Sequence, residues 1–228
     1  MNVKTLTCAI AALALAAGGF AAPEKAKGKA AEKADKVTIQ QFPKLGRQST
    51  LDAPGLSGGS TIGVAWTGKP RKWIVLETKY DTTAKWTDQL TFTWHVLLET
   101  ATATSKDKDD REKMAPYSYF TQTVTYYNIP RGSHAASVCL PPSYLERFGE
   151  ARAVGVTIAD KNGEVVNGDT ESAVKAIKPH TKFWEDPKIM DAKDKAGEPL
   201  IERRQGLLDR AKTIWALVNP NDYETAVQ

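Results

Sequence analysis

The sequence predicts an all-β fold, an immunoglobulin-like β-sandwich of about seven to nine strands with one or two short helices. Apolar and polar residues alternate over most of the chain from residue 37 onward, which is the period of a half-buried strand. Turn residues separate these runs, and helical periodicity is scarce. With 228 residues, of which 41% are hydrophobic and 25% charged, the chain is large enough to bury a core.

The clearest strand covers residues 89–99. One face carries five apolar side chains and the other carries polar ones: Leu90, Phe92, Trp94, Val96 and Leu98 against Thr91, Thr93 and His95. Residues 117–127 alternate in the same way, with Phe120, Val124 and Tyr126 on one face. The charged stretch 105–113 is then the loop of a long hairpin.

Shorter runs predict the other elements. Strands are expected at residues 37–42, 61–66, 73–80, 137–140, 153–159 and 164–167. Asn162-Gly163 is typical of a hairpin turn, because both residues tolerate a positive φ. Short helices are expected at residues 143–148 and 171–178. Residues 200–218 fit either a helical stripe interrupted by Gly206 or an edge strand with an irregular closing segment.

The first 21 residues are typical of a secretory signal peptide. Lys4 precedes a short apolar run, and Gly19 and Ala21 suit a cleavage site after Ala21. Residues 22–36 lack large apolar side chains and predict a flexible Lys/Ala-rich tether, which leaves residues 37–228 as a single domain. Gly19-Phe20 also resembles a prepilin cleavage site, but Pro23 and a run of lysines replace the apolar helix that a pilin keeps.

This signal predicts an exported protein, in the periplasm, on the outer envelope surface or outside the cell. Export leaves Cys139 as the one mature cysteine, so no internal disulfide is expected and Cys139 is predicted to be a buried apolar residue. Of the net charge of +4, residues 37–228 carry only +1. A nearly neutral domain argues against a nucleic-acid partner. After cleavage no membrane span is expected.

Motifs for catalysis or metal binding lack their structural context. The G-x-S-x-G match around Ser57 lacks a strand before it and a helix after it. The three histidines, His95, His134 and His180, form no metal-ligand spacing, and the acidic run that starts at Asp107 lacks the glycine and glutamate of a calcium loop. We therefore expect no enzyme, no cofactor and no metal.

Aromatic side chains suggest an interaction surface. The candidates on exposed faces are Trp73, Trp86, Tyr117, Tyr119 and Tyr127. Aromatic residues give a large contact area at low entropic cost, so such a face suits a protein or glycan partner. The alternative is a second buried face, since both sides of a central strand can be covered.

The closing segment carries a family resemblance. Gly206-Leu207-Leu208, Arg210, Thr213, Trp215-Ala216-Leu217 and Asp222-Tyr223-Glu224 resemble the pilus-associated exported proteins of Akkermansia and other Verrucomicrobia, which are linked to a type IV pilus-like gene cluster. The resemblance implies a structural or adhesive role in the envelope and carries over no active-site residue.

Together these features predict a non-enzymatic exported structural or interaction protein of a pilus-like or cell-envelope assembly. Its partners would be other proteins of that assembly or copies of itself, bound through sheet edges and aromatic faces. A carbohydrate-binding module that uses exposed Trp and Tyr is the alternative. A hydrolase ranks third, because it requires Ser57 or Cys139 close to a histidine.

Overall fold

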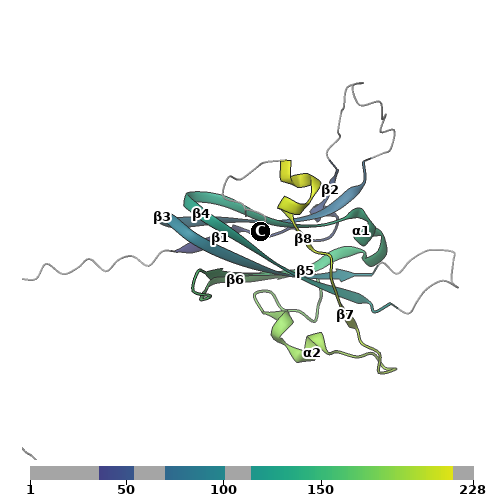
Figure 1. Cartoon of the computed structure of the whole chain (residues 1–228). Helices are drawn as coiled ribbons and strands as arrows, with labels where there is room; N and C mark the ends of the chain where they lie inside the picture. Colours follow the sequence, from purple (N-terminus) through teal and green to yellow (C-terminus); the bar gives the residue numbers. More distant parts are fainter. Residues whose placement is uncertain (1–35, 54–69, 101–113, 218–228) are drawn as a thin grey trace, which may run out of the picture. The chain divides into compact units, whose positions relative to one another are not determined.

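The computed structural model describes residues 36–53, 70–100 and 114–217 (Figure 1). Eight strands within these ranges belong to one sheet: β1 (Val37–Gln41), β2 (Thr50–Asp52), β3 (Lys72–Glu99), β4 (Tyr117–Leu140), β5 (Glu150–Asp160), β6 (Val165–Ser172), β7 (Ile201–Arg204) and β8 (Leu208–Asp209). Helices are short there: α1 (Pro142–Phe148), α2 (Pro187–Met190) and the 3-10 turns η1 (Gly46–Ser49), η2 (Phe183–Glu185), η3 (Arg210–Lys212) and η4 (Ile214–Leu217).

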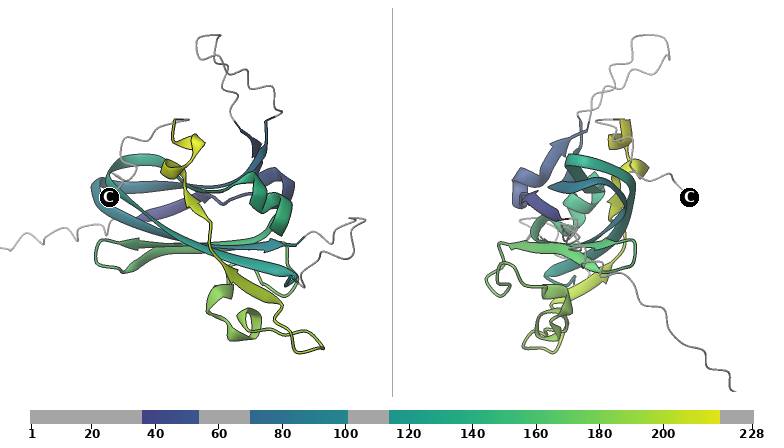
Figure 2. Two further views of the ribbon diagram at one scale, coloured as in Figure 1. Left: turned by 45° about the vertical axis from the view of Figure 1, so that its right-hand side comes forward. Right: turned by 90° about the vertical axis from the view of Figure 1, so that its left-hand side faces the viewer.

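The long strands β3 and β4 run through both layers of the sandwich. Residues 72–82 of β3 and 132–140 of β4 pair with each other and with β1, β2 and β8, which together form the β1 layer. Residues 89–99 of β3 and 117–127 of β4 pair with each other and with β5 and β7, and β6 lies outside β5. These last strands form the β5 layer. The sandwich is therefore one bent sheet that faces itself (Figure 2).

The bend lies where the β3–β4 register shifts between Thr82 and Trp86. Trp86 is opposite Pro130, which has no N–H for the ladder, and Asn128 takes a left-handed φ of 53°. The Thr82 hydroxyl donates to the Pro130 carbonyl at 2.7 Å, and Nε2 of His134 lies 2.7 Å from the same oxygen. These contacts hold the bend in one geometry.

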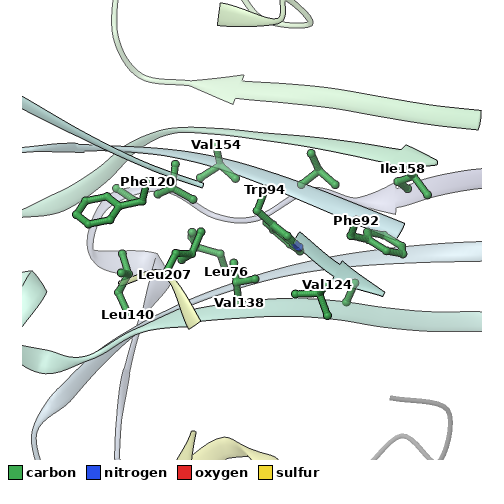
Figure 3. Close-up of a cluster of buried hydrophobic side chains, with 14 of the residues drawn as sticks. Leu76, Phe92, Trp94, Phe120, Val124, Val138, Leu140, Val154, Ile158 and Leu207 are labelled. Atoms are coloured by element: carbon green, nitrogen blue, oxygen red, sulfur yellow. The ribbon is translucent and has the colours of Figure 1, made fainter. Parts of the chain in front are cut away.

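The main core lies between the two layers. The alternating apolar side chains of β3, β4 and β5 converge there, and Trp94 is fully buried among them. Figure 3 shows Val154 and Ile158 of β5 on one side of Trp94 and Val138 and Leu140 of β4 on the other. Burial of these side chains stabilises the fold by about 1.5–3 kcal/mol each before the entropy of ordering is subtracted.

A second apolar cluster covers the outer face of the β5 layer. Its buried members are Leu97, Tyr119, Ala153, Ile177, Phe183, Met190 and Ile201. Residues 173–200, which include η2 and α2, supply the covering side chains, and Figures 1 and 2 show this light-green segment beyond β5 and β6. The β5 layer is thus buried on both faces at one end, whereas threonines 91, 93, 123 and 125 stay partly or fully exposed at the other.

The structure confirms the all-β sandwich and the face assignments of the hairpin. The strands expected at residues 73–80 and 89–99 are parts of β3, and those at 117–127 and 137–140 are parts of β4. The strands expected at residues 37–42, 153–159 and 164–167 correspond to β1, β5 and the beginning of β6, and the helix expected at 143–148 is α1. The strand expected at residues 61–66 lies outside the described residues.

The helix expected at residues 171–178 is wrong. β6 continues to Ser172, whose hydroxyl accepts from the Val174 amide at 3.0 Å and starts a turn. One turn is enough to bring Val174 and Ile177 onto the second cluster. Of the stretch 200–218, the described residues 200–217 follow the edge-strand alternative, because Gly206 has φ 124°, a value that no helix contains.

Candidate functional site

The outer face of the β5 layer holds an aromatic stack built on His95. This residue lies directly opposite Gly155 in the β3–β5 ladder. The indole of Trp184 in η2 rests on Gly155 and is parallel to the His95 imidazole, with ring centroids 3.9 Å apart. Phe183 meets the same indole edge to face at 5.2 Å. The missing side chain of Gly155 is what allows the indole to stand this close to the sheet.

Burial sets the protonation of the stack. His95 is only 8% exposed, and its Nδ1 lies 2.6 Å from the Tyr119 hydroxyl. Burial, with a smaller contribution from the positive charge of Lys182, lowers the pKa of His95 to about 4. Burial also raises the pKa of the Tyr119 hydroxyl. At neutral pH both groups are therefore uncharged, and the stack is a structural unit.

A hollow of about 350 Å³ opens beside Trp184, between η2 and the edge strand β6. We call it the Trp184 hollow. Its lining combines the indole with polar and small side chains: Thr157, Asn167, Gly168, Asp169, Thr170, His180 and Lys182, together with Val165 and Val166. His95 stacks on the indole but is not part of this lining.

His180 also lines the hollow. Its φ of 61° is in the left-handed region that non-glycine residues rarely enter, at a cost of about 1–3 kcal/mol. Its backbone N–H donates to the Thr170 carbonyl at 3.2 Å, and its Nδ1 lies 2.6 Å from Oδ1 of Asp169. These two contacts hold the imidazole over β6 in spite of the strained backbone.

The outer edge of β6 pairs with no other strand among the described residues, but its backbone groups at Gly168 and Thr170 are hydrogen-bonded within the chain. The amide of Gly168 donates to Oδ1 of Asn167 and the amide of Thr170 donates to Oδ1 of Asp169, both at 2.7 Å. The Thr170 carbonyl is taken by His180. An added strand would need these groups, so β6 is protected against pairing with another chain.

The structure separates the five aromatic residues of the expected interaction surface. Tyr119 is 8% exposed and, with the half-buried Tyr117, belongs to the second cluster, so the alternative of a second buried face applies to this pair. Trp73 is half-buried opposite the exposed Leu51 of β2. Trp86, 59% exposed, and Tyr127, 39% exposed, flank the bend of the hairpin. The five residues do not form one continuous surface.

The histidines and the cysteine make structural contacts. Cys139 is fully buried in β4, His134 binds the bend at Pro130, and His180 binds Asp169. Ser57 and Asp107 lie outside the described residues. Within residues 36–53, 70–100 and 114–217, no group of three His, Cys, Asp or Glu side chains is placed to hold a metal ion.

A second hollow, of about 390 Å³, lies between α1 and β7. Arg147, Arg203 and Arg204 line it together with Tyr144. The Arg204 guanidinium stacks over the Phe148 ring at 4.7 Å and is hydrogen-bonded to Glu202. Glu202 thus offsets part of the positive charge of this hollow.

A protein-family model matches residues 28–225, which is most of the chain. The chain belongs to this family of pilus-associated proteins. Membership confirms the resemblance carried by the closing segment. It also indicates an envelope-associated or exported protein that has protein partners in an assembly.

The fold of this protein is similar to that of a solved structure. A crystal structure from Akkermansia muciniphila is 19% identical, covers 85% of this chain and 94% of that chain, and has a TM-score of 0.57. At this identity the likeness shows the fold alone. β-D-glucoside glucohydrolase from Trichoderma reesei is 8% identical over 61% of this chain and 19% of that chain, and its TM-score of 0.22 is too low to support an argument. No curated protein matches the chain.

The sequence analysis did not single out Trp184, Asp169 and Lys182, which line the Trp184 hollow. An aromatic pair, Phe183-Trp184, stands between two prolines in a polar stretch, and this is the local signal that was available. Within the described residues, no helix is long and apolar enough to cross a membrane.

Proposed function

We propose that this pilus-associated protein is exported, has no catalytic activity, and works as a structural and interaction subunit of a pilus-like or cell-envelope assembly. Residues 1–21 would be its signal peptide and residues 22–36 a flexible tether to the sandwich domain. Support for a non-catalytic role comes from the described histidines and Cys139, which are engaged or buried in structural contacts.

The main support for an interaction role is the exposure of Trp86. Tryptophan is enriched among the residues that dominate the binding energy of protein interfaces. Trp86 is 59% exposed on a bend that Pro130 and His134 hold in place, so it is presented on a rigid support. Tyr127 adds a second exposed aromatic side chain to this bend. We infer that a protein partner packs its apolar surface on the bend.

Patch packing fits better than strand pairing at the β6 edge. The outward amides of Gly168 and Thr170 are bonded by side chains of β6 itself. At this edge the partner's side chains, rather than its backbone, would therefore meet this protein. The partner is another protein of the assembly or a second copy of this chain.

Photo-crosslinking in the native cells tests the interaction role. A photoreactive phenylalanine analogue replaces Trp86 in one strain and the exposed Lys195 in a control strain. We expect crosslinked envelope proteins, or crosslinked copies of this chain, from position 86 but not from position 195. Absence of any crosslink from position 86, with the protein present at its normal level, contradicts the proposal.

Two further measurements test the rest of the proposal. N-terminal sequencing of the protein from the cell envelope is expected to begin at Ala22, since cleavage after Ala21 is predicted. A mature chain that begins at Met1 and stays in the cytoplasm contradicts export. Turnover of generic ester, peptide or glycoside substrates by the purified protein contradicts the non-catalytic role.

A further inference from the structure

The Trp184 hollow presents a flat aromatic wall with a fixed position. One side of the indole is occupied by His95, and Phe183 meets it edge to face. Trp184 lines the hollow and His95 does not, so the indole side away from His95 is the one available to a ligand there. Gly155 and the second cluster hold the ring in place. A rigid indole face suits a ligand that has a flat face of C–H groups.

The rim beside this wall supplies directed hydrogen-bonding groups. Oδ1 of Asp169 accepts from the Thr170 amide and contacts Nδ1 of His180. Among the described residues Oδ2 has no such contact, so it can accept a hydrogen bond from a ligand. Thr157 adds a hydroxyl group. Asn167 accepts from the Gly168 amide through Oδ1 and donates from Nδ2 to the Val37 carbonyl at 2.8 Å, which leaves one N–H of its amide for a ligand. Because β6 and the tethered His180 fix these groups, a ligand would meet them without further ordering.

The hollow has no excess of positive charge within the described residues. Asp169 is a carboxylate whose Oδ1 lies 2.6 Å from Nδ1 of His180, and Nζ of Lys182 lies 3.2 Å from Oε1 of Glu185. A phosphate or another strong anion would therefore find no uncompensated cluster of positive charge. The volume of about 350 Å³ is at the lower end of small-ligand sites, which span about 300–1,000 Å³. A small, neutral ligand rich in hydroxyl groups fits these properties.

A peptide strand fits less well. A peptide that extended the sheet would need the outward backbone groups of β6, and those of Gly168 and Thr170 are already bonded. A sugar ring needs none of them. It combines a C–H face, which stacks on an indole, with hydroxyl groups that bond to carboxylate and amide side chains.

We propose that the Trp184 hollow is a saccharide site for a neutral hexose or N-acetylhexosamine residue of a glycan. The C–H face of the ring stacks on Trp184, and its hydroxyl groups donate to Asp169 and bond to Asn167. The site lies on a different part of the molecule from Trp86, so it is independent of the protein interface proposed above. Failure of either proposal leaves the other standing.

The test uses the protein without its predicted signal peptide, residues 22–228. The probes are glucose, galactose, N-acetylglucosamine and N-acetylgalactosamine. Saturation-transfer NMR identifies which sugar binds, and an amide and indole N–H titration locates it. We expect at least one sugar to bind with a millimolar Kd and to shift the resonances of Gly168, Thr170 and Trp184. No transfer to any of the four sugars at about 20 mM overturns the proposal.

Matched variants decide whether the hollow is responsible. Trp184→Ala is expected to abolish binding, whereas Trp86→Ala, which removes an exposed tryptophan elsewhere, is expected to leave the Kd within twofold. Asp169→Asn keeps Oδ1 for its two contacts and replaces Oδ2 with an amide group, so the fold is retained and binding is expected to weaken at least fivefold.

Three outcomes would contradict the saccharide site. They are loss of binding in Trp86→Ala alone, an unchanged Kd in Asp169→Asn, and sugar-induced shifts confined to residues away from β6 and η2. Displacement of the sugar by a peptide that shifts the same resonances more strongly would assign the hollow to a protein partner instead. Asp169→Asn keeps the test decisive where Trp184→Ala fails to fold.

Discussion

The indole of Trp184 stands where a side chain at position 155 would begin: a Cβ on Gly155 would lie 2.0 Å from Cζ3 of Trp184. Real atoms do not approach that closely, so one of the two groups must move if position 155 gains a methyl group. The φ of Gly155 is outside the left-handed region, so its backbone would otherwise accept any residue. Glycine at position 155 leaves the space that the Trp184 indole occupies.

Gly155→Ala is therefore expected to expel Trp184 from its stack with His95. We expect the free energy of unfolding to fall by about 1–3 kcal/mol, the usual cost of overpacking. Urea denaturation measures the change. In a Trp184→Ala background the same substitution should cost much less, because the clash is gone. An equal cost in both backgrounds would show that the clash is not the cause.

Acid is expected to destabilise the fold through His95. Its pKa is about 4 in the folded chain against 6.5 ordinarily, so only the unfolded chain takes up a proton between these values. The stability is fully present above about pH 6.5 and falls as the pH drops toward 4, by at most about 3 kcal/mol. Urea denaturation at pH 7 and pH 4.5 measures the loss.

His95→Gln removes this titration but leaves the carboxylates unchanged. The loss of stability between pH 7 and pH 4.5 should therefore be smaller in the variant than in the natural protein. An NMR titration of the His95 ring gives the pKa directly. Identical pH profiles for the two proteins would refute the assignment.

Tyr119 and Tyr127 are expected to respond differently to the same substitution. Tyr119→Ser opens a cavity in the second cluster and should cost about 3–5 kcal/mol. Tyr127→Ser changes a partly exposed side chain and should cost less than about 1 kcal/mol. Thermal and urea unfolding measure both. Equal costs would mean that Tyr119 is no more buried than Tyr127.

Exposing the β6 edge is expected to cause self-association. The double substitution Asn167→Thr with Asp169→Thr removes the side-chain acceptors of the Gly168 and Thr170 amides and keeps strand propensity high. It also removes the Asn167 bond to the Val37 carbonyl and the contact of Asp169 with His180, which frees the β6 edge further. Light scattering after gel filtration should then show a concentration-dependent increase in mass. Glu171→Thr, on the same strand, is the control and should stay like the natural protein. A double variant that is no larger than this control would argue against edge protection.

The hairpin was predictable because its pattern is local. Alternation from Leu90 to Leu98 fixed which side chains face the core, and it also placed His95 on the opposite face. The bend was missed because residues 81–88 are mostly polar, so the pattern predicts two separate strands on either side of them. The absence of glycine and proline from residues 72–99 is a signal that they belong to one strand.

The Trp184 hollow was not predictable from local patterns. Trp184 is 89 positions after His95, and only the folded sheet brings the two rings together. The role of Gly155 likewise depends on what stands above it. The segment around η2 has no strong periodicity, since single side chains such as Phe183 and Ile177 attach it to the sheet. Such contacts have no repeating sequence signature.

The sharing of β3 and β4 between the layers has a mechanical consequence. Two separate sheets can slide apart once the contacts between them fail, but here each layer continues into the other through unbroken peptide bonds. We therefore expect the two layers to unfold together rather than one after the other.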